Sequence, residues 1–121
     1  MSTTVEAHTI AINAAILQDR RAEQAHKISE IKAVLTLSGH NTLYRQALAL
    51  GLCRSTTWNL LTGGHKHGGL TADVVNTILT CPTLPEPVRM VILDYVQRKL
   101  AGDYGHSPKA IERFRARLLV A

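Results

Sequence analysis

The sequence is poor in aromatic residues, which make up 4% of the chain, and it has only two cysteines. Any core must therefore be built mainly from Leu, Ile, Val and Ala, which pack readily between helices. Cys53 and Cys81 form no CxxC pair. The N-terminus has no early Lys or Arg, so we expect no signal peptide. No apolar run approaches the roughly 18–20 residues that a membrane span needs. We expect a soluble, cytoplasmic protein with free thiols and no membrane contact.

Acidic residues are missing from a long central window. No Asp or Glu occurs from Ile31 to Ala72. An ordinary solvated surface mixes both charge signs, so this window favours a polyanionic partner such as nucleic acid. The alternative is a mildly basic surface without a partner. The window's basic residues and histidines are Lys32, His40, Arg45, Arg54, His65, Lys66 and His67.

Strand patterns are nearly absent, whereas apolar residues recur at helical spacing along the whole chain. The length fits one compact domain with an extended terminal arm. We predict an all-α protein of about seven helices. The first should span residues 5–25, and a second should carry Ile28, Ile31 and Leu35. Five more should follow, with Asn41 or Thr42, Thr71 and Ser107 as caps, Gly51 as a helix end, and Pro87 and Pro108 in first turns.

Two short predicted helices around Gly51 have the layout of a helix-turn-helix. That motif needs a small residue where the helices cross, and Ala47 is small. It needs a left-handed turn residue, which Gly51 supplies. It also needs apolar residues where the second helix packs back, here Leu52 and Leu60.

With the run Cys53, Arg54, Ser55, Thr56 and the closing stretch from Leu60 to Gly63, this segment resembles the phage repressor and Cro-like (XRE-type) helix-turn-helix family. The resemblance covers roughly residues 28–100. It implies a five-helix repressor-like DNA-binding domain there. The two ends lie outside the resemblance, and we expect an N-terminal helical arm over 1–27 and a basic C-terminal helix over 101–121. The chain departs from the family pattern at Cys53, Thr57 and Gln46, where a capping serine, a Val or Ile, and a leucine are usual.

In such proteins the second helix enters the major groove of DNA. By position, the resemblance assigns base contacts to Arg54, Ser55, Thr56 and Asn59, whose side chains suit base edges. We expect Trp58 to be partly exposed, and we favour packing on a neighbouring helix over contact with a sugar or a thymine methyl. Contacts with the DNA backbone are expected from Asn41, Thr42 and Arg45 at one helix start, and from Thr62, His65, Lys66 and His67 on a glycine-rich loop.

The resemblance implies a sequence-specific regulator of transcription, a repressor by default, that binds double-stranded DNA as a homodimer without a cofactor. The stripes Ile10, Ala14, Leu17 and Ile111, Phe114, Leu118 are the candidate dimer faces. An alternative is a helical protein-interaction module, adaptor or antitoxin-like, that acts through its terminal helices. A third is a nucleic-acid binder indifferent to sequence. We expect no metal site, because His65 and His67 lack paired ligands, and no enzyme, because no catalytic motif occurs.

Overall fold

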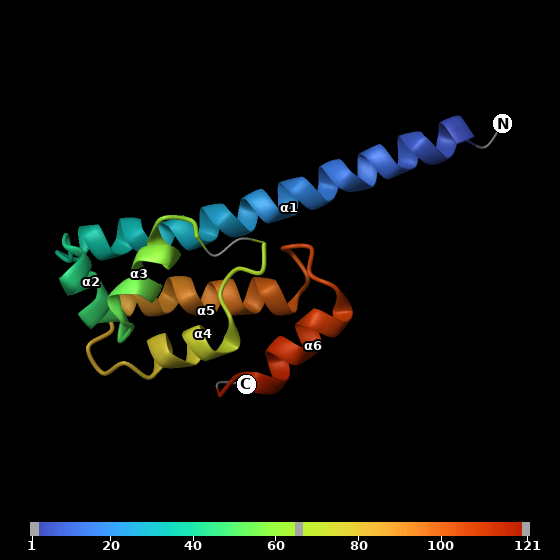
Figure 1. Cartoon of the computed structure of the whole chain (residues 1–121). Helices are drawn as coiled ribbons and strands as arrows, with labels where there is room; N and C mark the ends of the chain where they lie inside the picture. The colour runs from blue at the N-terminus through green and yellow to red at the C-terminus, as the bar shows by residue number, and fades with distance from the viewer. Residues whose placement is uncertain (1–2, 65–66, 120–121) are drawn as a thin grey trace.

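The computed structural model describes residues 3–64 and 67–119, with side chains from Thr9 onward, and these residues form six helices and no strand (Figure 1). The all-α prediction is therefore confirmed. The helices are α1 (Thr3–Leu37), α2 (Leu43–Leu50), α3 (Arg54–Leu61), α4 (Ala72–Leu79), α5 (Glu86–Leu100) and α6 (Pro108–Arg117).

The first two predicted helices are one. No Gly or Pro interrupts the sequence before Gly39, so nothing ends the helix between residues 25 and 28. The helix α1 is therefore 35 residues long. The expected boundary between residues 27 and 28 falls inside it. The described residues accordingly contain six helices rather than about seven.

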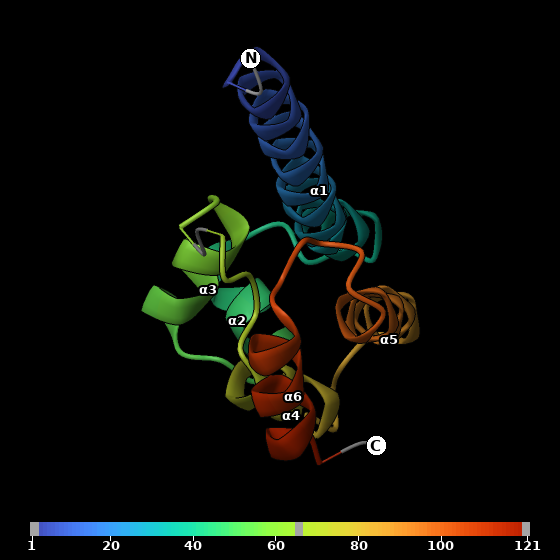
Figure 2. The same cartoon turned by 90° about the vertical axis from the view of Figure 1, so that its right-hand side faces the viewer.

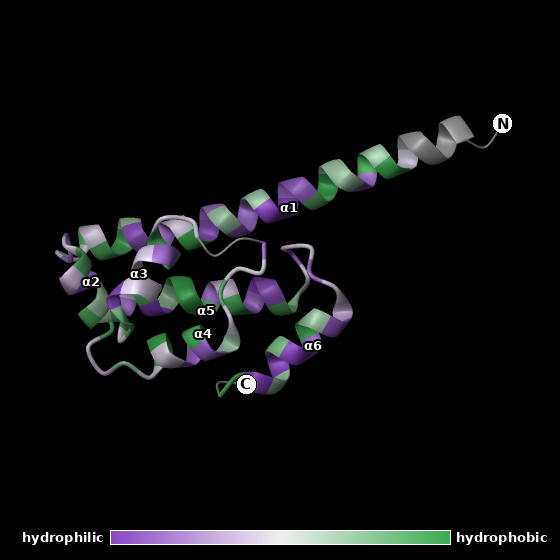
Figure 3. Ribbon diagram, viewed as in Figure 1, coloured by the Kyte–Doolittle hydropathy of each residue, from purple (hydrophilic) through white to green (hydrophobic). Residues whose placement is uncertain are grey.

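The two halves of α1 have different surroundings. In the second half, Ile28, Ile31 and Leu35 are buried, as their spacing predicted. The first half extends beyond the other helices (Figure 1). Its apolar side chains are therefore exposed, with Ile10 at 68% and Ile12 and Ile16 at 46% each. Figure 3 shows the turns that carry them as hydrophobic segments of the projecting part.

The expected capping residues are found at three helix starts. The hydroxyls of Thr42, Thr71 and Ser107 accept hydrogen bonds from the backbone N–H groups three residues further on. Each bond satisfies an N–H that has no partner within its helix. Gly51 ends α2 in the left-handed conformation, with φ of 72°, and its N–H donates to the Ala47 carbonyl at 2.9 Å.

One core joins all six helices. The helix α5 contributes Val88, Ile92 and Tyr95, which are fully buried, and it lies along α1 (Figures 1 and 2). The short helices α2, α3 and α4 pack at one end, with α3 on the side away from α5 (Figure 2). The helix α6 covers α4 and α5 through Phe114. Across the described ranges, no helix is both long enough and apolar enough to cross a membrane.

Candidate nucleic-acid interface

The turn between α2 and α3 is fixed by close packing. A Cβ atom at Gly51 would lie 3.0 Å from the Cβ of Cys81, so a larger residue would push α2 away from the segment after α4. Thr57 is fully buried, and its hydroxyl donates to the Cys53 carbonyl at 2.9 Å. Because that bond satisfies the hydroxyl, a threonine can pack where the family pattern has Val or Ile. Gln46 is also buried and donates to the His40 carbonyl at 3.1 Å.

The outward face of α3 carries most of the predicted base contacts. Arg54, Ser55 and Asn59 are exposed, whereas Thr57 and Leu60 face the core. Thr56 differs, because it is half-buried and lines a cavity of about 140 Å³ between α3 and the start of α4. Three of the four predicted base contacts are therefore exposed on one helix face.

Trp58 also belongs to this outward face. It is 57% exposed, in keeping with the partial exposure that we expected from the sequence. The reason is its place on the helix, one residue beyond the buried Thr57. A turn of 3.6 residues moves each successive side chain by about 100°, which carries Trp58 away from the core.

The side chain of Arg54 is held by a residue of α2. Its guanidinium lies 5.6 Å from the centroid of the Tyr44 ring, a cation–π contact. Tyr44 is itself 58% exposed. This contact places the start of α2 beside the start of α3. The polar groups before and within the first turn of α2 thus lie near Arg54.

Those polar groups are Asn41, Thr42 and Arg45, which are all exposed. The Thr42 hydroxyl accepts from the Arg45 N–H at 3.2 Å as the helix cap. Among the described residues, every ion pair lies on α1, α5 or α6. Within that part of the chain, Arg45 and Arg54 have no carboxylate partner, so both are available to an anion.

Cys53 is the exposed residue just before α3, and its side chain makes no cap bond to the backbone. Its sulfur lies 3.4 Å from the Ser55 hydroxyl and 3.1 Å from the Thr56 hydroxyl. Hydrogen bonds from Ser55 and then Thr56 stabilise the thiolate and lower the pKa of Cys53 to about 7. Two of the predicted base contacts, Ser55 and Thr56, thus use their hydroxyls to bond the Cys53 sulfur.

The predicted backbone contacts after α3 lie at its other end. The Thr62 hydroxyl donates to the Trp58 carbonyl at 2.6 Å, so a phosphate oxygen would have to replace that bond. His67 is exposed and follows on the loop. His65 and Lys66 lie outside the described residues. The structure therefore groups Asn41, Thr42 and Arg45 with Arg54, and separates them from Thr62 and His67.

Buried polar side chains anchor the loop that follows α3. Gln24 donates to the His67 carbonyl, and the Tyr95 hydroxyl accepts from the Leu70 N–H, both at 2.9 Å. Lys99 donates to the carbonyls of Gly68 and Leu70, at 2.9 and 2.8 Å. The backbone of residues 67–70 is thus attached to α1 and α5.

Sequence reasoning missed Gln24 and Lys99, although a signal was present. Gln24 continues the buried stripe of α1 one turn before Ile28, and Lys99 continues that of α5 one turn after Tyr95. Each position calls for a buried residue by its spacing alone. Both were passed over because their side chains are polar.

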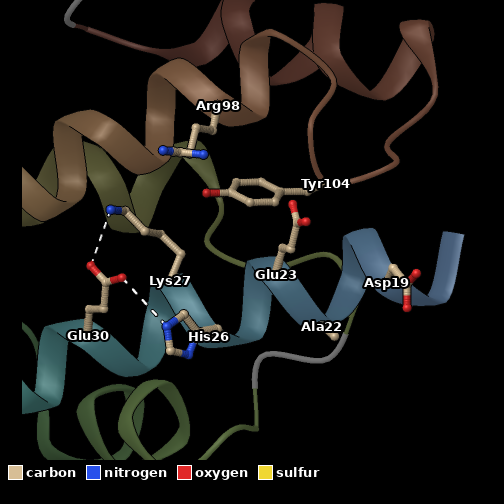
Figure 4. A pocket seen from close by; sticks show the side chains of 8 residues that line it. All are labelled: Asp19, Ala22, Glu23, His26, Lys27, Glu30, Arg98 and Tyr104. Atoms are coloured by element: carbon tan, nitrogen blue, oxygen red, sulfur yellow. Dashed lines mark hydrogen bonds and ion pairs between the residues drawn. The ribbon is translucent and has the colours of Figure 1, made fainter. Parts of the chain in front are cut away.

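A second hollow lies between α1, α5 and the segment after α5 (Figure 4). Its volume is about 630 Å³, and the Tyr104 hydroxyl points into it between Lys27 and Arg98. Lys27 pairs with Glu30 and Asp94, and Arg98 pairs with Asp94. Burial opposes the charged form of Lys27, but its bonds to Asp94 and Glu30 prevail and raise its pKa. Those four charges balance, but Asp19 and Glu23 also line the hollow, so its lining carries a net negative charge.

Comparisons with protein-family models, with curated proteins and with solved structures found no match to this chain.

Proposed function

We propose that this protein is a sequence-specific regulator of transcription that binds double-stranded DNA, with α2 and α3 as a helix-turn-helix inside a repressor-like domain. The helix α3 enters the major groove. Repression by blocking access of the polymerase is the default mechanism, and neither a cofactor nor catalysis is part of the proposal.

The observation that carries the proposal is the outward face of α3. It presents Arg54, Ser55 and Asn59 to solvent, on a helix without acidic residues. Arginine can donate two hydrogen bonds to guanine O6 and N7, and asparagine can pair with adenine N6 and N7. An outward face with these two side chains supports readout of base edges.

Contacts around α3 supply the sequence-independent part of binding. Asn41, the free N–H groups at the start of α2 and Arg45 form a site for one phosphate. The anchored loop with His67 offers another at the far end of α3. Since backbone contacts release counterions, affinity should fall steeply as salt rises.

We further propose that the protein binds as a homodimer through the projecting half of α1. Ile10, Ile12 and Ile16 are largely exposed there. Residues 9–18 carry no Asp, Glu, Lys or Arg, so charge pairs cannot stabilise this segment as a solitary helix. Ile12 and Ile16 lie four residues apart on one face, so pairing with a second copy would cover them. It would also present two copies of α3 to the DNA, as a palindromic site requires.

The first experiment is selection of bound duplexes from a random-sequence pool at two salt concentrations, followed by sequencing. We expect one enriched palindrome. Arg54→Ala and Asn59→Ala should each relax the preference at one base pair and cost about 1–3 kcal/mol there. Arg45→Ala should weaken all duplexes about equally and reduce the salt slope by about one. Binding without enrichment would contradict specificity, and no binding at low salt would contradict the proposal.

The second candidate is a helical protein-interaction module, and the exposed apolar half of α1 is the observation that favours it. In that case the partner protein, rather than a second copy, covers Ile12 and Ile16. Arg54→Ala and Asn59→Ala would then leave partner binding unchanged, while Ile12→Glu would abolish it.

A further inference from the structure

Trp58 is the only tryptophan of the chain, and it is 57% exposed. Tryptophan commonly buries about 150–250 Å² in cores and interfaces, so leaving it in water forgoes a large gain. Exposed tryptophan and arginine are the side chains most enriched where proteins make their strongest contacts. The exposed indole therefore points to a partner at this place on α3.

The position of Trp58 indicates what that partner touches. It follows Arg54 by one turn and Ser55 by three residues, so it lies on the same flank of α3 as Arg54. Arg54 itself lies against the Tyr44 ring, on the exposed side of α2. Whatever the Arg54 side chain contacts, the indole of Trp58 reaches the adjacent part of the same surface.

Building on the proposed function, we propose that Trp58 is a specificity-determining residue that reads thymine through the C5-methyl group. In the major groove only thymine presents an apolar group. The indole offers an apolar surface and one donor but no acceptor, so it suits a methyl group better than the polar edge of guanine or cytosine.

The spacing along α3 places this thymine. Four residues of helix advance about 6 Å, and base pairs stack about 3.4 Å apart along one strand. With α3 along the groove, the thymine lies about two base pairs from the base that Arg54 reads. The selected site should show a thymine at that distance in each half.

The test removes the methyl group alone. Each thymine of the highest-affinity duplex from the random pool is replaced, one position at a time, by deoxyuridine. We expect one position per half-site at which the wild type binds about fourfold more weakly, the loss for one buried methyl group. Trp58→Ala should bind the thymine and uracil duplexes equally. Met90→Ala, at a residue 60% exposed on α5, is the control and should discriminate like the wild type.

Fluorescence gives a second readout, because Trp58 is the only indole. Its emission should shift to shorter wavelength on addition of the thymine duplex, and acrylamide should quench it less. Equal affinity of the wild type for every thymine and uracil duplex would overturn the role of Trp58 and leave DNA binding standing; it would mean contact with sugar or none. If no duplex binds at all, this inference and the proposed function are both overturned.

Discussion

The Nζ atom of Lys99 lies 4.2 Å from the centroid of the Phe114 ring, in a cation–π contact inside the protein. Lys99 is 6% exposed, and its hydrogen bonds go to the carbonyls of Gly68 and Leu70. Burial lowers the pKa of Lys99 to about 8. The loop after α3 and the last helix thus meet at one buried amine.

From this pKa we predict that stability rises with pH. An unfolded lysine has a pKa of about 10.4, so between about pH 8 and 10 the unfolded chain binds more protons than the folded one. The free energy of unfolding should therefore increase by about 1–2 kcal/mol from pH 7.5 to 9.5 through Lys99. Urea denaturation of the wild type and of Lys99→Met measures it as the difference between the two.

The comparison with Lys99→Met removes the contribution of Cys53, which also titrates in this range and is present in both proteins. The window stops at pH 9.5 because burial raises the pKa of Tyr104 to about 12, which lowers stability once unfolded tyrosine ionises near pH 10. A pH-independent difference between the two proteins would contradict the prediction.

Two adjacent glycines should respond differently to substitution. Gly69 has φ of +66°, and a Cβ atom there would overlap Gln24 Oε1 and the Tyr95 hydroxyl. We expect Gly69→Ala to lower the free energy of unfolding by about 1–3 kcal/mol, from strain and from the broken anchor of the loop. Gly68→Ala is the matched control, because a Cβ atom there meets no described atom within 4 Å. Thermal denaturation of both variants decides; an equal loss would mean that the buried contacts do not matter.

The two thiols should differ in reactivity. Cys53 is exposed with a pKa of about 7, whereas Cys81 is buried. Because the thiolate is the reactive form, iodoacetamide at pH 7.5 should modify Cys53 first and Cys81 only on unfolding. Mass spectrometry after brief labelling gives the order. Ser55→Ala should slow the reaction of Cys53 by removing a hydrogen bond to the thiolate, and similar rates at both cysteines would refute this account.

The projecting half of α1 should govern the oligomeric state. Introducing two charges through Ile12→Glu and Ile16→Glu should convert a dimer into a monomer, because each charge would have to be buried in the interface. Light scattering measures the mass, and circular dichroism reports whether the body remains folded. Met90→Glu changes a comparably exposed apolar residue on α5 and should leave the dimer intact. A wild type that is monomeric at high concentration would rule out this interface.

The sequence predicted those features that depend on neighbours along the chain. Thr42, Thr71 and Ser107 cap their helices, and Gly51 ends α2, because each acts through backbone groups a few residues away. The hydroxyl of the buried Thr57 is satisfied just as locally, by the Cys53 carbonyl four residues earlier, although the family pattern has Val or Ile there.

Contacts between distant segments could not be predicted from the sequence. Tyr44 supports Arg54 across the turn, and Gln24 meets the loop at His67. A helical wheel shows which side of a helix a residue occupies, but it does not show what lies opposite.

The unbroken course of α1 has a mechanical consequence. A helix of 35 residues is about 52 Å long and stiff, so whatever its tip holds is kept at a set distance and rotation from α3. One residue inserted in the projecting half would turn the tip by about 100°, whereas seven would lengthen it by about 10 Å and nearly restore its direction. The rigid helix thus fixes the orientation of α3 relative to anything bound at the N-terminal end of α1, and the length of the projecting half sets that orientation.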